Sequence, residues 1–200
     1  MLTTRVLAAI LLATSALPVA CTAVSTYPPT AGATRMTPSV SPGPELMASA
    51  IRETHRVRGD GGQIVFNLPA GLDAGTWRRV ASQLPSGSRA MRTSDERAYS
   101  VQQLRLSGGT AEVDVAYPEG GVYQLMTVKF EGGPLVPWRV QWAYRWVIPT
   151  PMPIANDPMI AVEATEAAEA ERVAAEQAAA TESAEPATEQ AAASTDASEG

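Results

Sequence analysis

The 200-residue chain has few of the side chains on which metal and nucleophilic chemistry depend. It contains one cysteine, Cys21, and one histidine, His55. A single cysteine excludes an intramolecular disulfide and any metal site built from several cysteines, and a single histidine excludes a site with two histidine ligands. His55 stands among charged residues of an expected helix, where a surface or half-buried role accounts for it.

The patterns of common catalytic centres are also missing. No strand–turn–helix nucleophile motif accompanies His55, and the glycine-rich stretch 59–62 lacks the Lys-Ser/Thr that completes a phosphate-binding loop. Glu112 and Asp114 share one face of an expected strand and could form an acid–base pair. Arg105 is expected on the same face of the neighbouring strand, which favours ordinary cross-strand pairing. We therefore expect a protein that is not an enzyme, with no cofactor and no metal.

Acidic residues outnumber basic ones, and they gather at one end of the chain. The formal net charge is −6. Residues 45–150 carry 12 basic and 10 acidic side chains, whereas residues 151–200 carry 11 acidic side chains against Arg172 alone. An acidic chain with its charge in a tail binds polyanions poorly, so nucleic acid is not an expected partner.

The one long uncharged run lies at the N-terminus. Arg5 precedes an uncharged stretch that reaches Ala20, with small residues before Cys21. This layout is typical of a secretory signal, and the run is too short to span a bilayer comfortably. We expect residues 1–20 to be a signal peptide and the protein to be exported to the cell envelope.

The end of this segment resembles the signal of bacterial lipoproteins, whose cysteine becomes the lipidated first residue of the mature chain. The resemblance rests on Leu17-Pro18-Val19-Ala20-Cys21, and it departs from the family pattern because Pro18 stands where leucine is usual. It implies a lipid on Cys21 and a membrane-anchored protein that faces away from the cytoplasm. Without that lipid, cleavage after Ala20 or Ala23 would leave a secreted protein.

Two stretches of biased composition flank residues 45–150. Residues 21–44 are rich in proline, threonine and serine, which predicts a disordered, extended spacer. Residues 151–200 form an Ala/Glu-rich acidic tail that we expect to be disordered and dispensable for stability from residue 155 on. Residues 161–180 favour partial helix but have no apolar face to bury. A helix that docks on a basic partner is the alternative.

Residues 45–150 predict an α+β domain: two N-terminal helices and a short strand packed on a four-stranded antiparallel meander. Helices are expected over 45–58 and 73–84, where apolar residues recur at helical spacing. A strand is expected between them, over 63–68, and the four strands of the meander follow from Tyr99.

Glycine pairs set the expected register of the meander. A two-residue turn at Gly108-Gly109 sorts apolar and charged residues onto opposite faces. It pairs Leu106 with Ala111, Leu104 with Val113, Arg105 with Glu112 and Gln103 with Asp114. A second turn centred on Glu119-Gly120 keeps the apolar face continuous, since it opposes Val113 to Met126 and Ala111 to Val128.

The last strand alternates over eleven residues, and its apolar side is rich in tryptophan. Trp138, Val140, Trp142, Tyr144, Trp146 and Ile148 are expected to face the same way. The connection over 131–137 would set Phe130 opposite Trp138, Val128 opposite Val140 and Met126 opposite Trp142. We expect this side to be the core, with Trp142 buried beneath the second helix. If Trp142 is instead exposed with no protein over it, glycan binding becomes the leading hypothesis.

Two functions remain open. One is a non-enzymatic cell-envelope protein with an interaction or assembly role. The other is a small-ligand or glycan binder that uses a pocket or platform at the Trp-rich face, with Trp138, Tyr144 and Trp146 as candidate ligand-facing residues. The element order and the closing Trp138-Arg139-Val140 are loosely similar to the NTF2-like domains of bacterial lipoproteins. This resemblance implies a cone-shaped α+β fold over about 65–148 and carries over no functional residue.

Overall fold

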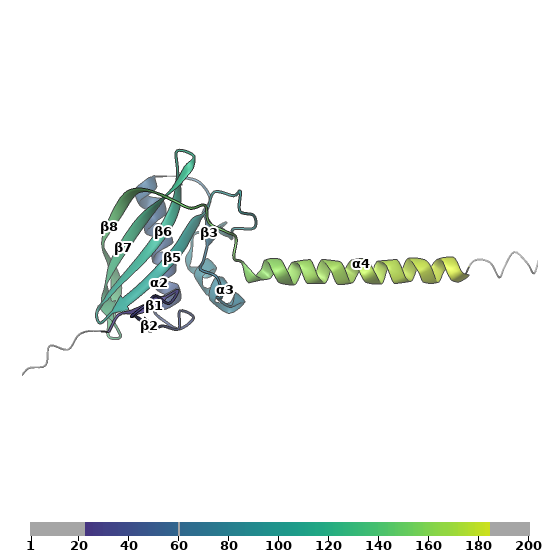
Figure 1. Cartoon of the computed structure of the whole chain (residues 1–200), viewed down its shortest axis with the longest axis horizontal. Helices are drawn as coiled ribbons and strands as arrows, with labels where there is room; N and C mark the ends of the chain where they lie inside the picture. The colour runs from purple at the N-terminus through teal and green to yellow at the C-terminus, as the bar shows by residue number, and fades with distance from the viewer. Residues whose placement is uncertain (1–22, 60, 185–200) are drawn as a thin grey trace, which may run out of the picture.

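The computed structural model, which describes residues 23–59 and 61–184, is a curved sheet with two helices on one face and a third helix that projects away (Figure 1). The expected α+β fold is confirmed. The expected signal segment 1–20 and Cys21 lie outside the described residues.

Helices α2 (Gly43–Arg58) and α3 (Ala74–Gln83) begin and end at residues suited to those positions. Asp73 precedes α3, and its carboxylate accepts a hydrogen bond of 2.9 Å from the Thr76 N–H, which satisfies one of the free donors of the first turn. Gly59 follows α2 with a φ of 70°, a left-handed conformation that favours glycine. The expected helices are therefore confirmed to within two residues at each end.

In the part of the chain that the structure describes, the sheet has eight strands. They are β1 (Ser25–Tyr27), β2 (Thr34–Arg35), β3 (Val65–Asn67), β4 (Arg89–Ala90), β5 (Tyr99–Ser107), β6 (Thr110–Glu119), β7 (Val122–Gly133) and β8 (Val136–Thr150). The main order is β2-β1-β5-β6-β7-β8, and β3 pairs in parallel with β4 and with the start of β5. The meander β5–β8 thus ends in β8, which lies at one edge of the sheet.

Strands β1 and β2 lie within the stretch expected to be a disordered spacer. Thr26 and Tyr27 are buried, and β1 pairs with β5 so that Ser25 lies opposite Leu106. The Tyr27 hydroxyl donates a 2.6 Å hydrogen bond to the carbonyl oxygen of Ala70. The proline-rich stretch thus contains two good strand formers, Thr26 and Tyr27, directly before Pro28.

The first hairpin has the expected register throughout, with Leu104 opposite Val113 and Arg105 opposite Glu112. The second was predicted two residues out of place: Val113 lies opposite Val128, and Ala111 lies opposite Phe130. Its turn is Gly120-Gly121, with φ values of 56° and 90°. Both values are positive, so a glycine pair suits this turn better than Glu119-Gly120 does. A shift of two residues leaves every side chain on its expected face.

The inner face of the sheet, covered by α2 and α3, carries a closed apolar core. Phe66, Leu104, Tyr117, Met126 and Phe130 are almost fully buried there. Trp77 on α3 lies 5.7 Å from Phe66 between ring centroids. Helix residues and the side chains of β3, β5, β6 and β7 therefore fill most of this core, and Trp138 is the aromatic side chain of β8 that packs against it.

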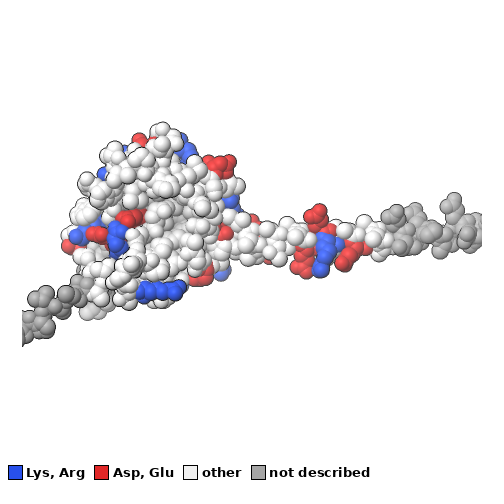
Figure 2. Space-filling model, viewed as in Figure 1, with Lys and Arg blue, Asp and Glu red and all other residues white. Residues whose placement is uncertain are grey.

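Helix α4 (Pro158–Ala184) projects from the domain (Figure 1), and its charged side chains are exposed to solvent (Figure 2). The tail that we expect to be dispensable begins at residue 155, and its first residues contact the domain before α4 begins. The Asn156 N–H donates to Asn67 Oδ1 at 3.1 Å, and the Asn156 side chain donates to the carbonyl of Leu68. Among the described residues, no helix has the length and apolar character needed to cross a membrane.

Candidate functional site on the outer face of the sheet

The side chains of β8 do not alternate regularly between the two faces of the sheet along the whole strand. Val140 lies opposite Phe130 and Trp142 opposite Lys129, so Gln141 is an extra residue that forms a bulge. A bulge of one residue exchanges the faces of all the side chains beyond it. The expected pairing of Met126 with Trp142 is therefore wrong, because Met126 lies opposite Arg145.

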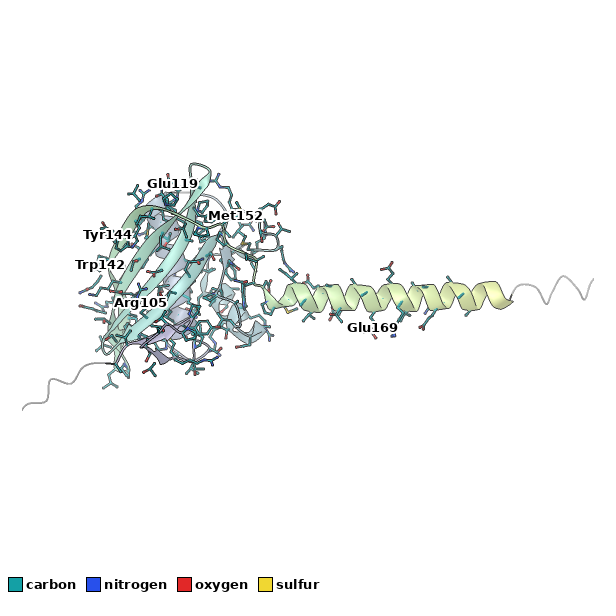
Figure 3. All side chains as sticks on the ribbon, in the orientation of Figure 1. Arg105, Glu119, Trp142, Tyr144, Met152 and Glu169 are labelled. Atoms are coloured by element: carbon teal, nitrogen blue, oxygen red, sulfur yellow. The ribbon has the colours of Figure 1, made fainter. Side chains whose placement is uncertain are left out.

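The bulge turns three aromatic side chains away from the helices. Trp142, Tyr144 and Trp146 lie opposite the outward-facing residues of β7, with exposed fractions of 43%, 53% and 42%. We call these three residues the outer aromatic row; Trp142 and Tyr144 are labelled along β8 in Figure 3. The prediction that Trp142 is buried under the second helix is wrong, since α2 and α3 lie on the opposite face (Figure 1).

Protein contacts hold the rings of the outer aromatic row in fixed positions. Tyr144 and Trp146 meet edge to face, with centroids 4.7 Å apart and planes at 70°. The Lys129 ammonium lies 5.7 Å from the centroid of Trp142, within the range of a cation–π contact. The row is thus half-exposed and ordered, with a corner between Tyr144 and Trp146 in place of a flat surface.

A chain of hydrogen bonds beneath the row fastens it to the sheet. The Trp146 indole N–H donates to Thr127 Oγ1 at 2.9 Å, and the Thr127 hydroxyl donates to Asp114 Oδ1 at 2.6 Å. The Arg105 guanidinium donates to both carboxylate oxygens of Asp114, at 2.7 and 2.8 Å. Paired, bidentate contacts of this kind fix geometry as well as charge.

One cation in this network serves two carboxylates. Arg105 also donates to Glu112 at 3.2 Å and to the Gln103 side-chain oxygen at 3.0 Å. Its hydrogen bonds to Asp114 raise the pKa of Arg105 above its ordinary value, against the opposing effect of burial. The expected cross-strand pairing is therefore confirmed, and Glu112 and Asp114 serve as partners of Arg105 in place of an acid–base pair. Figure 3 labels Arg105 on the side of the sheet that carries Trp142 and Tyr144.

The candidate ligand-facing residues separate into two places. Tyr144 and Trp146 belong to the outer aromatic row, whereas Trp138 lies before the bulge and packs half-buried against the core. Gly132 makes room for it, since a Cβ there would lie 2.7 Å from the Trp138 Cα. Sequence reasoning assigned Trp142 to the core and missed it as a site residue. No pattern along β8 itself marks the bulge that turns Trp142 outward toward Lys129.

Trp138 lines a groove at the end of the sheet where β7 connects to β8. The groove has a volume of about 600 Å³. Its wall comes from the start of α2, the β5–β6 turn and residues 133–138, and it includes Pro42, Glu45, Leu106 and Leu135. The wall is mainly apolar, and Leu135 lies exposed at its rim.

Other candidate sites offer less chemistry. His55 stacks on Tyr99 with centroids 5.4 Å apart, and its Nε2 lies 3.2 Å from the carbonyl oxygen of Gly62, whereas its buried Nδ1 has no hydrogen-bond partner among the described residues. Among residues 23–59 and 61–184, no group of three or more His, Cys, Asp or Glu side chains could hold a metal ion. The outer aromatic row is therefore the best-formed candidate site.

No family model matches the chain, and neither a curated protein nor a solved structure matches it. The loose resemblance to NTF2-like domains stays a prediction.

Proposed function

We propose that this chain is an exported, lipid-anchored envelope protein without catalytic activity, and that the outer aromatic row binds glycan. One observation carries the proposal: three half-exposed aromatic rings lie on the helix-free side of the sheet. A buried Trp142 would have made these rings part of the core. Because Trp142 is exposed instead, glycan binding is the better explanation of the row. These rings do not cover the core beneath the helices, so core packing does not explain why three aromatic side chains lie here. Binding of a ligand does.

The physical basis is stacking between aromatic rings and the C–H faces of sugar rings. Residues two apart on a strand are separated by about 6.6–6.8 Å, which is close to the length of one sugar unit. Ligand sites combine such apolar surfaces with a few polar groups that fix orientation. Lys129, Gln141 and Arg139 stand beside the row and supply hydrogen-bond donors at its rim.

The edge-to-face contact between Tyr144 and Trp146 determines which shape of glycan the row can bind. A sugar that stacks on one ring meets the edge of the other, so the corner holds one unit and Trp142 holds its neighbour. This arrangement fits a short, bent glycan segment better than a flat crystalline surface. Because Thr127 and Asp114 already orient Trp146, little ordering of the protein is required on binding.

The test is titration calorimetry with soluble cell-wall oligosaccharides of two to six units. Trp142→Ala and Tyr144→Ala should each weaken binding at least tenfold. Val147→Ala is the matched control, since Val147 is 85% exposed on the same strand and belongs to no ring contact. The glycan proposal would be refuted if the parent bound no oligosaccharide. It would also be refuted if Val147→Ala weakened binding as much as Trp142→Ala and Tyr144→Ala do.

Export and anchoring are tested separately. Mass spectrometry of the mature N-terminus should show a lipid on Cys21 and loss of residues 1–20. Cys21→Ser should move the protein from the membrane fraction to the soluble fraction. If the variant fractionates as the parent does, the anchor is wrong whatever the result with glycan.

A second candidate function is assembly through the edge of β8, and one observation favours it. Within the described sheet β8 pairs with β7 alone, and side chains on both of its faces are exposed, Val140 and Val147 on one and the aromatic row on the other. An exposed edge can accept a further strand. Sedimentation should then show self-association at micromolar concentration that Val147→Lys weakens. A chain that remains monomeric at such concentrations would exclude self-assembly.

A further inference from the structure

The described chain enters the sheet at one end. Ser25 pairs with Leu106, next to the β5–β6 turn at Gly108-Gly109. The β7–β8 connection lies at the same end, because the Gly132 N–H donates to the Gly109 carbonyl at 3.0 Å. This end is the lower one in Figure 1, away from the β6–β7 turn.

The distance between Cys21 and the domain is short. Three residues lie between Cys21 and Ser25, so their Cα atoms are four steps apart, and an extended chain advances at most about 3.6 Å per residue. The start of β1 therefore lies no more than about 14 Å from the Cα of Cys21, by the same rise. A lipid on Cys21 would hold this end of the domain at the surface of the membrane, with no spacer between them.

The same end carries exposed apolar side chains. Leu135 is 97% exposed at the tip of the β7–β8 connection, between Pro134 and Val136. Val136, the next residue in the sequence, is exposed as well, and Val24 is exposed where the chain enters β1 at this end of the sheet. A single exposed leucine is ordinary on a protein surface, but a fully exposed leucine that rims an apolar groove of about 600 Å³ leaves a continuous apolar surface uncovered.

We propose that this end, the membrane-facing tip formed by Val24 and residues 134–137, inserts into the interface of the lipid bilayer. The proposal rests on the lipid anchor of the proposed function. The position of the chain entry selects the lipid surface as the occupant, since no other apolar partner is held within reach by covalent attachment. The lipid would hold the N-terminus of the mature chain at the bilayer, and the tip supplies a second contact that fixes the orientation of the domain on it.

The depth of insertion is limited by nearby polar groups. Glu45 lines the same groove, and Arg35 is exposed on β2 close to the chain entry. Both side chains fit the headgroup layer and not the hydrocarbon. Leu135 and Val136 therefore reach the boundary between headgroups and acyl chains, as the apolar face of an interfacial segment does.

The test uses tryptophan fluorescence in vesicles whose acyl chains carry bromine, which quenches indoles that enter the bilayer. The protein is purified from exporting cells in the form they produce. If its mass shows no lipid, the thiol of Cys21, the single cysteine, is coupled to a maleimide lipid in the vesicles. Leu135→Trp is the test variant, and Val147→Trp is its control because Val147 is similarly exposed on the same strand beyond the bulge.

The expected result is quenching of the added indole in Leu135→Trp that is at least threefold greater than in Val147→Trp. Equal quenching of the two variants would overturn the tip proposal. The two proposals can fail separately. If the protein from cells carries no lipid, the anchor is refuted. If the indole of Leu135→Trp is then quenched after chemical coupling of Cys21, the tip proposal is supported all the same. Circular dichroism checks that both variants keep the parent fold.

Discussion

The region beneath α2 and α3 and the region formed by β8 use the same kinds of residue for opposite purposes. Trp77 is almost fully buried against Phe66, whereas Trp142 is half-exposed on the far side of the sheet. The inner region is closed by the helices and by aliphatic and aromatic side chains of β3 and β5–β7, and β8 contributes only Trp138 and Ala143 at its margin. Aromatic content alone therefore does not indicate where a core lies, because register decides which face a side chain takes.

The largest expected effect is in the inner region. Trp77→Ala should cost about 3–5 kcal/mol of unfolding free energy, since it removes a buried aromatic ring and leaves a cavity. Denaturant unfolding followed by circular dichroism measures it. A cost below about 1 kcal/mol would mean that the core is less closed than its burial indicates.

The segment between β8 and α4 should give the next largest effect. Deletion of residues 155–200 removes the hydrogen bonds of Asn156 to Asn67 and Leu68. It should cost about 2 kcal/mol, at roughly 1 kcal/mol for each hydrogen bond lost. Deletion of residues 164–200 keeps these bonds and should leave the melting temperature unchanged within error. Equal melting temperatures for the two deletions would show that residues 155–163 are dispensable as well.

Replacement of a tryptophan by alanine should lower the unfolding free energy less in the outer region than in the core. Trp142→Ala should cost about 1 kcal/mol, because the ring already contacts water and only its packed side is lost. Denaturant unfolding alongside Trp77→Ala makes the comparison direct. If the two tryptophans cost the same, the distinction between a closed inner region and an open outer one fails.

The smallest effect concerns pH and the attachment of α3. Hydrogen bonds from Ser39 and Thr76 hold the pKa of Asp73 well below its ordinary value. The stabilisation is present at neutral pH and is lost as the pH falls through the acidic range, since the unfolded chain then binds a proton that the folded chain does not. Asp73→Ala should lower the melting temperature at pH 7 and less so at pH 3. Asp73→Asn, which keeps the cap, should show little pH dependence, and parallel curves for the parent and both variants would contradict this account.

The part of the fold that could be predicted is the part in which several signals agree. At the first hairpin, the glycine pair, the apolar residues and the pairing of Arg105 with Glu112 all require one register. At the second turn, two neighbouring centres both place glycine in the turn. Only the positive φ of both Gly120 and Gly121 separates them.

The candidate site could be predicted only in part, because a bulge leaves no mark in an alternating sequence. Trp138 and Trp142 lie in the same alternating run, yet Gln141 between them turns one inward and the other outward. The tertiary fit of Trp138 over Gly132 and the contact of Lys129 with Trp142 favour the bulge. Neither contact can be derived from periodicity along a single strand.

The bulge has a consequence for length changes in β8. Val140 and Trp142 belong to two runs of opposite phase that Gln141 joins as one extra residue. Deletion of Gln141 would remove this irregularity from the ladder and still leave Val140 inward and Trp142 outward. A strand that can lose a residue at this position without moving its aromatic row should tolerate that deletion, whereas deletion of Ala143 should turn Trp142 inward.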